Sequence, residues 1–390
     1  MTTKLHVFKF LLHSNVMKTN SNTKVCFLLG SLNRGGAETL LLDVLRDSKK
    51  NNLNVMVIYR KKGVLENDFK STEVSMNFLP FKKNILSYLI KLRKVLLRED
   101  VEIVHSHQFI DAFYAYLACL GTKKSIVLTT HGYDLNFSRV ANLIHHFIIR
   151  KTDLNIYVSN YQKNYYEEKY QLNHSKQTVV YNGISFEKLF TPTNNQSIRT
   201  ELKIAPDTQI FGMVGNFVKV RNHFFICKFI EKLRDNGVDF HFVFIGKRSD
   251  TYPELFDNCK QFIHDHQLSS KVSFLGTRSD VPTILKELDS FVYATDHDTF
   301  GIAVVEAIAI GIPVFVNDWE VMKEISGNGE YATLYKTNDL QDLYEKFEEF
   351  LSNSQQFKEK AIKASDYVQK EFGIQHHIEL LKKNYADLKS

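Results

Sequence analysis

The chain has 390 residues, 44% of them hydrophobic and 24% charged, which is ordinary for a globular protein and too long for one comfortable core, so we expect two domains. Its four cysteines lie far apart without C-x-x-C spacing, which argues against a disulfide framework and favours reduced cysteines in a cytoplasmic protein. No apolar stretch reaches the roughly 20 residues that cross a bilayer.

The charge is divided unevenly along the chain. Residues 1–190 hold 27 Lys and Arg against 15 Asp and Glu, whereas residues 191–390 hold 23 against 29. The basic side chains gather at Lys82–Lys83, Lys91–Arg98 and Lys123–Lys124, without the interleaved aromatic residues of RNA-binding sheets. We therefore expect no nucleic-acid partner and favour peripheral contact with an anionic membrane surface, with a plain solvated face as the alternative.

The elements begin after residues 1–23, which we interpret as a variable leader because they lack the long apolar region and cleavage site of a signal peptide. Met17 is an alternative start. From residue 24 to 190, apolar runs alternate with helical patterns, as in a doubly wound parallel sheet. The predicted strands are 24–29, 54–59, 103–107, 125–130, 155–158 and 178–181, and the predicted helices are 37–47, 85–98, 140–150 and 160–170.

A polar, turn-rich connection at Thr191–Ser197 opens the second domain, residues 191–369, where the alternation restarts. We predict an α/β protein with two Rossmann-like, doubly wound domains facing a central cleft. The second series has predicted strands at 210–214, 239–245, 272–275 and 290–293 and a further strand after Pro313, with helices at 223–236, 251–266, 281–288 and 302–310 and two or three more in the tail.

Glycines and cations follow several of these strands. Gly35 and Gly36 lie between the first strand and a helix, where free N–H groups and the helix dipole would face an anion, although a loop without a ligand is the alternative. The loop matches neither G-x-G-x-x-G nor a Walker sequence. The second domain adds further strand-end residues that together indicate a cleft for an anionic ligand: Gly215, Lys219, Arg221, Gly246, Lys247 and Arg278.

Histidines end two strands of the first domain. His105 and His107 share one face of a strand by its period of two, and His131 ends the next strand before a glycine. No third ligand suggests itself, so we expect no metal and place His105 in the core. We expect the helical pairs His145–His146 and His376–His377 to be surface residues.

Two acids in the second domain flank a glycine turn. Asp298 precedes the predicted helix 302–310 and Glu306 lies about one turn inside it, with Gly301 allowing close approach of a ligand. Both stand at the carboxyl end of a strand, where open α/β sheets bind ligands. The alternative is a well-capped βαβ unit whose acids face solvent.

These motifs resemble the GT-B glycosyltransferases, and among them the retaining family 4 (glycosyl transferases group 1). The resemblance runs from Lys24 to about Tyr385. Asp298 and Glu306 match the E-x7-E motif. The other matching segments are Gly35–Glu38, His131–Gly132, Val158–Ser159, Val180–Ile184, Gly215–Arg221 and Gly276–Val281.

The resemblance implies roles for these residues. Glu306 would bind ribose hydroxyls, Arg221 would neutralise the diphosphate, and His131 would contact the donor sugar near the reacting carbon. Asp298 and the amides after it would hold the sugar, with residues 370–390 packing back on the first domain. The remaining donor-binding set is Gly35, Gly36, Gly215, Asn216, Lys219, Gly246, Lys247, Arg278, Thr299, Phe300, Gly301 and Ile302, and the acceptor side would include His107 and Asp134.

Three residues depart from the family pattern. Asn216 stands where an arginine is usual, Asp298 is one methylene shorter than the usual glutamate, and Ser185 replaces an aspartate. These changes bear on which donor is used more than on the fold.

The resemblance implies a retaining, metal-independent and cofactor-free transferase. The donor would be a nucleotide-diphosphate sugar, with UDP-sugars favoured. The acceptor would be a saccharide or lipid-linked saccharide of cell-surface polysaccharide synthesis, such as capsule, reached from the inner face of the cytoplasmic membrane. The alternatives are a sugar-nucleotide 2-epimerase and a non-catalytic nucleotide-sugar-binding protein.

Overall fold

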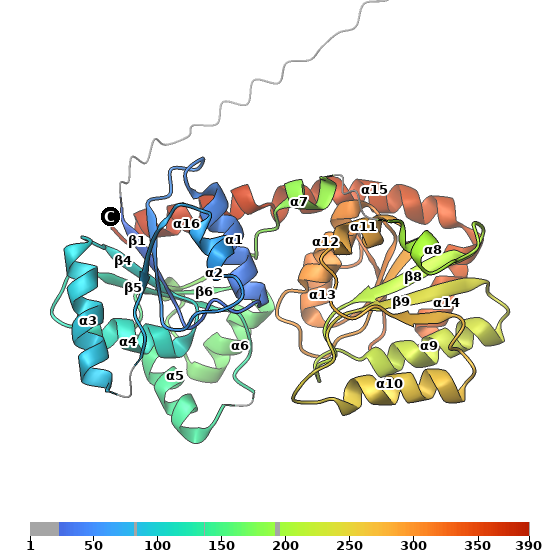
Figure 1. Ribbon diagram of the computed structural model, residues 1–390, viewed down its shortest axis with the longest axis horizontal. Coiled ribbons are helices and arrows are strands. Elements are labelled where there is room, and N and C mark those ends of the chain that lie inside the picture. Colours follow the sequence, from blue (N-terminus) through green and yellow to red (C-terminus); the bar gives the residue numbers. More distant parts are fainter. Residues whose placement is uncertain (1–22, 82–83, 136, 192–195, 390) are drawn as a thin grey trace, which may run out of the picture.

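The computed structural model describes residues 23–81, 84–135, 137–191 and 196–389. The expected leader, except its last residue, and the pair Lys82–Lys83 lie outside the described residues. The described chain forms two lobes, each built on one parallel sheet with helices around it (Figure 1). The predicted α/β class with two doubly wound domains is confirmed.

The first sheet has seven parallel strands in the order β3-β2-β1-β4-β5-β6-β7. Its order reverses at β1, which lies between β2 and β4, so the crevice beyond the carboxyl ends of β1 and β4 is where this topology binds ligands. The strands are β1 (Val25–Leu29), β2 (Val55–Tyr59), β3 (Ser75–Phe78), β4 (Ile103–Ser106), β5 (Ser125–Thr130), β6 (Leu154–Tyr157) and β7 (Gln177–Val179).

Helices cover both faces of this sheet, which explains the continuous apolar runs of its central strands. In β1, Phe27 and its alternate neighbours pack toward α1 and α16, whereas Cys26 and Leu28 pack toward α3 and α4. The helices of this lobe are α1 (Gly36–Ser48), α2 (Glu66–Lys70), α3 (Ile85–Arg98), α4 (Phe109–Cys119), α5 (Arg139–Lys151) and α6 (Asn160–Tyr170), joined by α16 (Ile374–Asp387).

The second sheet has six parallel strands in the order β10-β9-β8-β11-β12-β13. Its order reverses between β8 and β11, so the loops after these two strands form the second crevice. The strands are β8 (Gln209–Val214), β9 (Phe240–Ile245), β10 (Val272–Phe274), β11 (Ser290–Tyr293), β12 (Val314–Asn317) and β13 (Thr333–Tyr335). The helices are α7 (Phe186–Phe190), α8 (Ile198–Glu201), α9 (His223–Asp235), α10 (Glu254–Asp265), α11 (Val281–Lys286), α12 (Ile302–Ile310), α13 (Glu320–Ile325), α14 (Leu340–Ser352) and α15 (Ser354–Glu371).

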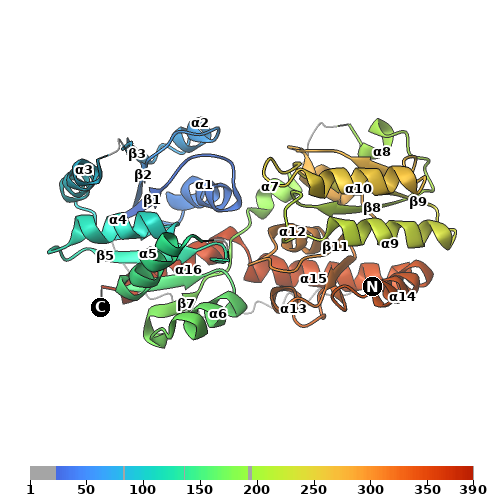
Figure 2. The same cartoon turned by 90° about the horizontal axis from the view of Figure 1, so that it is seen from below.

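The chain crosses between the lobes twice, and the two crossings touch. The Ile184 amide donates to the Phe372 carbonyl at 2.8 Å, and the Ile374 amide donates to the Ile184 carbonyl at 3.0 Å. Helix α15 comes just before the second crossing and packs on α12 in the second lobe. Helix α16 comes just after it and packs on α1 in the first lobe (Figure 2). The last described helix is therefore part of the first lobe.

Several elements were not predicted, namely α2, α4, α7, α8, α13, β3 and β13. Helix α4 was not predicted because apolar and aromatic residues occupy nearly all its positions, which leaves no helical period to detect. Strands β3 and β13 are only 4 and 3 residues long and lie at sheet edges. Short edge strands carry little apolar alternation, so the sequence pattern was silent there.

Candidate active site

The loop between β11 and α12 brings the paired acids to the crevice of the second lobe. Gly301, which precedes α12, has a φ of 82°, and a Cβ there would stand 2.7 Å from Met322 Cε. Glycine therefore meets both a backbone and a packing requirement. The first N–H groups of α12 have no partner within the helix. Ile302, the first residue of α12, faces Gly36 of the other lobe.

A cavity of about 400 Å³, the interdomain cavity, lies between these loops. Residues of both lobes line it, among them Gly35, Gly36, Asp43, Asn216, Ile302 and Glu306. No described residue makes a hydrogen bond or ion pair with the Glu306 carboxylate. Burial, together with the charge of Asp43, raises the pKa of Glu306 to about 7. The cavity thus contains a carboxylate, that of Glu306, to which no described residue donates a hydrogen bond.

Arg221, Tyr293 and Asp298 form one network that reaches the cavity lining at Asn216, whose carbonyl accepts from Arg221 Nη1 at 3.4 Å. Arg221 Nε donates to the Tyr293 hydroxyl at 2.7 Å, and that hydroxyl donates to Asp298 Oδ2 at 2.7 Å. The guanidinium also lies 3.8 Å from the same carboxylate oxygen. The predicted diphosphate cation and the predicted sugar-binding acid are therefore coupled through a phenol that is fully buried.

The glycine loops of the second lobe contact each other. A Cβ on Gly246 would lie 2.0 Å from the Gly215 carbonyl oxygen, so glycine is required there by the approach of two backbones. Next to it, Asn216 Oδ1 accepts from the Lys247 amide at 2.9 Å. Asn216 lines the cavity, but its side-chain oxygen ties the two loops together.

Three expected donor-binding cations are engaged elsewhere. Lys219 lies over the Tyr252 ring, 4.3 Å from its centroid, and Lys247 pairs with Asp250. Arg278 donates to both Glu201 and Asp280. None of the three lines the interdomain cavity, and their predicted contact with the donor stays a prediction. Neighbouring carboxylates pair with Lys247 and Arg278, whereas Lys219 lies on an aromatic ring.

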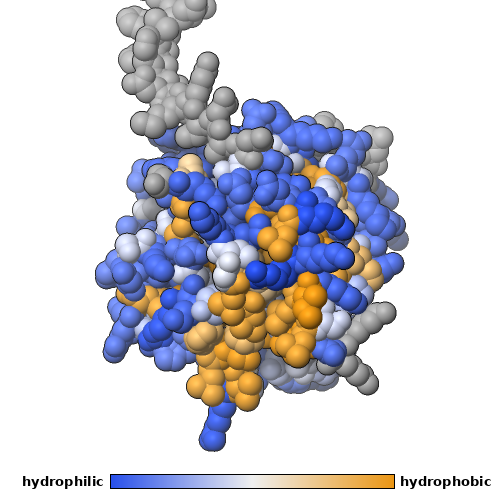
Figure 3. All heavy atoms as spheres, turned by 90° about the vertical axis from the view of Figure 1, so that its left-hand side faces the viewer, coloured by the Kyte–Doolittle hydropathy of each residue, from blue (hydrophilic) through white to orange (hydrophobic). Residues whose placement is uncertain are grey.

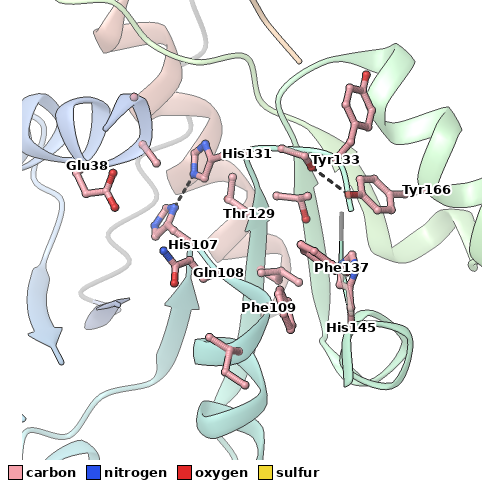
Figure 4. A pocket seen from close by; sticks show the side chains of 16 residues that line it. Glu38, His107, Gln108, Phe109, Thr129, His131, Tyr133, Phe137, His145 and Tyr166 are labelled. Atoms are coloured by element: carbon pink, nitrogen blue, oxygen red, sulfur yellow. Dashed lines mark hydrogen bonds between the residues drawn. The ribbon is translucent and has the colours of Figure 1, made fainter. Parts of the chain in front are cut away.

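The first lobe contributes a second cavity, of about 540 Å³, which we name the histidine cavity (Figure 4). His107 Nδ1 and His131 Nε2 are 3.1 Å apart, and the His105 and His107 rings stack with centroids 4.3 Å apart, as their shared strand face predicted. Burial lowers the pKa of His131 to about 4, so this imidazole is neutral at pH 7. It is a polar contact and not a cation.

His105, His107 and His131 form a row of stacked rings, and His105 is the member that lies in the core, as expected. Its Nε2 lies 2.7 Å from the Thr129 hydroxyl and its Nδ1 lies 2.6 Å from the Tyr385 hydroxyl on α16. Burial lowers its pKa to about 3. Both ring nitrogens are occupied, so His105 supports His107 and His131 from behind.

The side chains of two residues after Asp298 make contacts within the protein. The Thr299 hydroxyl donates to the His131 carbonyl at 2.9 Å, which is a direct contact between the lobes. The Phe300 side chain is buried and packs against Tyr181 and Phe372. Their backbone amides are the groups predicted to hold the sugar, and that contact stays a prediction.

Asp134, which was predicted on the acceptor side, is buried inside the first lobe. Its carboxylate is fully buried and accepts from Tyr165, Tyr170 and Lys169, with His145 at 3.5 Å. These donors hold the pKa of Asp134 well below its ordinary value against the opposing effect of burial. The carboxylate thus anchors α6, and Asp134 is not among the residues that line the histidine cavity.

The expectation that the helical histidine pairs are surface residues is wrong in two of four cases. His145 is only 2% exposed, within an aromatic cluster around Asp134, and His377 is 7% exposed with its Nδ1 2.6 Å from the Tyr181 carbonyl. Their neighbour His146 is exposed, as expected. A pair of adjacent helical residues cannot show from sequence alone which member faces inward.

Sequence analysis missed Glu324 on α13. Its carboxylate accepts from the Asn160 amide at 2.7 Å, the Tyr161 amide at 3.1 Å and the Tyr181 hydroxyl at 2.7 Å. A residue of the second lobe thus caps the N-terminus of α6 in the first. Neither Glu324 nor Tyr293 stands in a motif, so no local signal identifies them.

The described residues contain no group of three or more His, Cys, Asp or Glu placed to hold a metal ion. Among the helices of residues 23–81, 84–135, 137–191 and 196–389, none combines the length and apolar character needed to cross a membrane.

Two protein-family models match this chain, one for each lobe. A family model described as Glycosyltransferase Family 4 matches residues 34–188, and one described as Glycosyl transferases group 1 matches residues 194–368. The two matches cover both lobes and both crevices. The protein is therefore a GT-B glycosyltransferase, an enzyme of the hexosyl-transferring type. It belongs to family 4 of these enzymes.

Individual relatives agree with this assignment. The putative glycosyltransferase EpsF of Bacillus subtilis is 24% identical over 325 residues, 80% of this chain and 83% of that protein. The UDP-Gal:alpha-D-GlcNAc-diphosphoundecaprenol alpha-1,3-galactosyltransferase of Escherichia coli is 25% identical over 68% of this chain and 71% of its own. The structure of Anabaena HepE in complex with UDP superposes with a TM-score of 0.83 at 16% identity, covering 94% of this chain and 100% of HepE, a likeness of fold alone.

Proposed function

We propose that the enzyme transfers a hexosyl unit, with retention of anomeric configuration, from a UDP-sugar to a lipid-linked saccharide during cell-surface polysaccharide assembly such as capsule synthesis. The observation that carries this proposal is the interdomain cavity, where an unpaired Glu306 meets the N-termini of α1 and α12. A carboxylate suits two ribose hydroxyls and a helix N-terminus suits a phosphate, so one nucleotide diphosphate satisfies both.

Arg221 supplies charge stabilisation in this proposal. Its guanidinium is 24% exposed beside the cavity and is held by Tyr293 and Asp298. A cation fixed before reaction stabilises the charge that develops on the departing diphosphate without reorganisation, so no metal is required. Asp298 and the first N–H groups of α12 then bind the sugar hydroxyls.

The acceptor enters from the histidine cavity of the first lobe. His131, neutral at pH 7, makes a hydrogen bond to the donor sugar, while His107 orients His131. The leaving phosphate assists deprotonation of the acceptor hydroxyl, because every imidazole of this row has a pKa too low for an efficient base at neutral pH.

The lipid-linked acceptor is supported by the lining of the histidine cavity and by one relative. Phe109, Tyr133 and Phe137 line one side of the cavity, away from the histidine pair (Figure 4). The Escherichia coli relative is named for a diphosphoundecaprenol acceptor. A cytoplasmic enzyme bound peripherally to the inner membrane face would meet such a substrate.

A donor panel tests the function. UDP-, GDP- and ADP-sugars are screened by thermal shift, where a ligand at 100 times its Kd adds about 2.7 kcal/mol of stability. The stabilising donor is then incubated with lipid-linked saccharides, and the anomeric configuration of the product is determined by NMR. Stabilisation by UDP-sugars and a retained configuration are expected, with activity unchanged by a chelator. An inverted product, an epimerised donor or no transfer would contradict the proposal.

A further inference from the structure

The outer layer of the first lobe, formed by α3, α4 and α5, exposes large apolar side chains. Helix α4 packs between the other two. On α3, Leu86 and Ile90 are 68% and 67% exposed, and on α5, Val140 and Leu143 are 66% and 68% exposed. Each helix already buries its opposite side in the lobe, so these residues add nothing to its core. We call this layer the α3–α5 face.

The exposed charged side chains of helices α3, α4 and α5 are basic. Helices α3 and α5 contain no acidic residue, and the only acid of α4, Asp111, is buried and paired with Arg60 at 2.6 Å. Of the two acids just beyond α3, Glu99 pairs with Arg98 and Lys24, and Asp100 is exposed. The basic residues of α3 and α5 are Lys91, Arg93, Lys94, Arg98, Arg139, Arg150 and Lys151.

Aromatic rings join the helices across this face. Phe147 of α5 lies 5.6 Å from Tyr116 and 6.2 Å from Phe113 of α4, and Phe81 stacks on Tyr114 at 5.9 Å. Phe81 and Phe147 are 39% and 41% exposed. Figure 3, which views this end of the molecule, shows a continuous apolar area on its lower half. Apolar and aromatic side chains among lysines and arginines suit the interface of an anionic bilayer.

We infer that the α3–α5 face docks on an anionic lipid bilayer, with its exposed apolar side chains entering the headgroup boundary and its basic residues contacting lipid phosphates. The inference rests on the proposed function, since it supplies the route for a lipid-linked acceptor. Phe109 of α4 and His145 of α5 belong to this layer and also line the histidine cavity, so the cavity adjoins the bilayer. A second copy of the chain is disfavoured because pairing this face with itself would oppose like charges.

Vesicle sedimentation of the full-length enzyme tests the docking. Vesicles are made of phosphatidylcholine alone or with phosphatidylglycerol, in low and high salt. Binding is expected only with the anionic lipid and is expected to weaken in high salt. The triple variant Leu86→Ser/Ile90→Ser/Leu143→Ser and the triple variant Lys91→Gln/Lys94→Gln/Arg98→Gln are each expected to bind at least about tenfold more weakly.

Ile362→Ser is the matched control, because Ile362 is 63% exposed on α15 of the other lobe. It is expected to bind vesicles like the wild type. Equal binding by the wild type and both triple variants, or no binding to anionic vesicles, overturns the inference. So does a concentration-dependent dimer that the apolar substitutions abolish. UDP thermal shifts, measured in parallel without lipid, check that each variant is folded and separate a docking failure from failure of the proposed function.

Discussion

The Glu306 carboxylate is the group in the interdomain cavity whose charge changes near neutral pH. Its pKa is raised to about 7 by burial and by Asp43, whereas in the proposed donor complex a ribose hydroxyl donates to the ionised form. We therefore expect nucleotide binding to lower this pKa and to release a proton. We expect the affinity for UDP, measured by calorimetry, to fall by up to about tenfold per pH unit as the pH drops below 7.

Glu306→Gln provides the control for this pH dependence. UDP carries a phosphate that titrates in a similar range, and the variant keeps that titration while removing the carboxylate. The variant is expected to bind more weakly at pH 8 and to show a flatter pH profile. A variant with the wild-type affinity and slope would remove Glu306 from ribose binding. The cavity histidines do not complicate the profile, because the pKa values of His105 and His131 are lowered to about 3 and 4.

Tyr293 is bonded both to Arg221, the proposed diphosphate cation, and to Asp298, the proposed sugar-binding acid, so removing its hydroxyl should affect catalysis more than folding. Tyr293→Phe deletes one hydrogen bond from Arg221 and one to Asp298, each to a charged group. We expect a loss of about 1.5–3 kcal/mol of transition-state stabilisation, measured as kcat/KM. A double-mutant cycle with Asp298→Asn should show coupling of the two substitutions. Additive effects would contradict the coupling.

The sequence predicted some residues of this site and not others. Arg221, Asp298 and Glu306 were predicted from their distance to a strand end or a glycine and from the family resemblance. Tyr293 has the same sequence pattern as any buried strand residue, and Asp43 has that of any acidic residue of a helix, so neither was predicted. Lys219 and Arg278 were predicted to face the donor, and sequence does not reveal which aromatic ring or carboxylate lies beside each cation.

At the scale of elements, the start of α12 depends on Gly301. Gly301→Ala is expected to lose about 1–2 kcal/mol of unfolding free energy from its left-handed backbone. It should also weaken UDP binding, because the strained residue stands directly before α12 and an added Cβ, 2.7 Å from Met322 Cε, requires that side chain to move. Urea unfolding and calorimetry measure the two effects.

Gly237→Ala separates the two causes. Gly237 has a φ of 74° but no atom within 4 Å of an added Cβ. It should lose comparable stability while keeping the affinity for UDP. If both variants bound UDP equally well, α12 would not depend on the close packing at Gly301.

Elements with a clear period were the ones that sequence placed well. Helix α6 matches its predicted range at both ends, and the central strands β1 and β8 were evident from their apolar runs. Helix α4 was missed although it carries Phe109 of the histidine cavity and supports the α3–α5 face. Its uniform apolar character reflects burial between α3, α5 and the sheet, which is a tertiary property.

At the scale of the whole molecule, Glu324 holds the two lobes together without a ligand. Glu324→Gln removes the charge that accepts from the first N–H groups of α6. A change of about 1 kcal/mol would shift the ratio of closed to open molecules about fivefold. We expect a larger mean distance between fluorophores placed on the two lobes, and a smaller difference once UDP is bound.

Glu320→Gln is the matched variant for this experiment. Glu320 lies on the same helix, is exposed and pairs only locally, with Lys323 at 2.9 Å. It should leave the distance distribution unchanged. If Glu324→Gln also left it unchanged, the contact would accompany closure without stabilising it.

The return of α16 to the first lobe has a consequence for the order of synthesis. Tyr385 of α16 completes the bonding of His105, and Ile378 and Leu381 fill the core beside β1. The ribosome makes the entire second lobe between β7 and α16, which takes on the order of ten seconds or more. During that interval the first lobe is topologically unfinished and its apolar groove is open to chaperones, whereas the second lobe has most of its chain available to fold. The lobe made first is thus the lobe completed last.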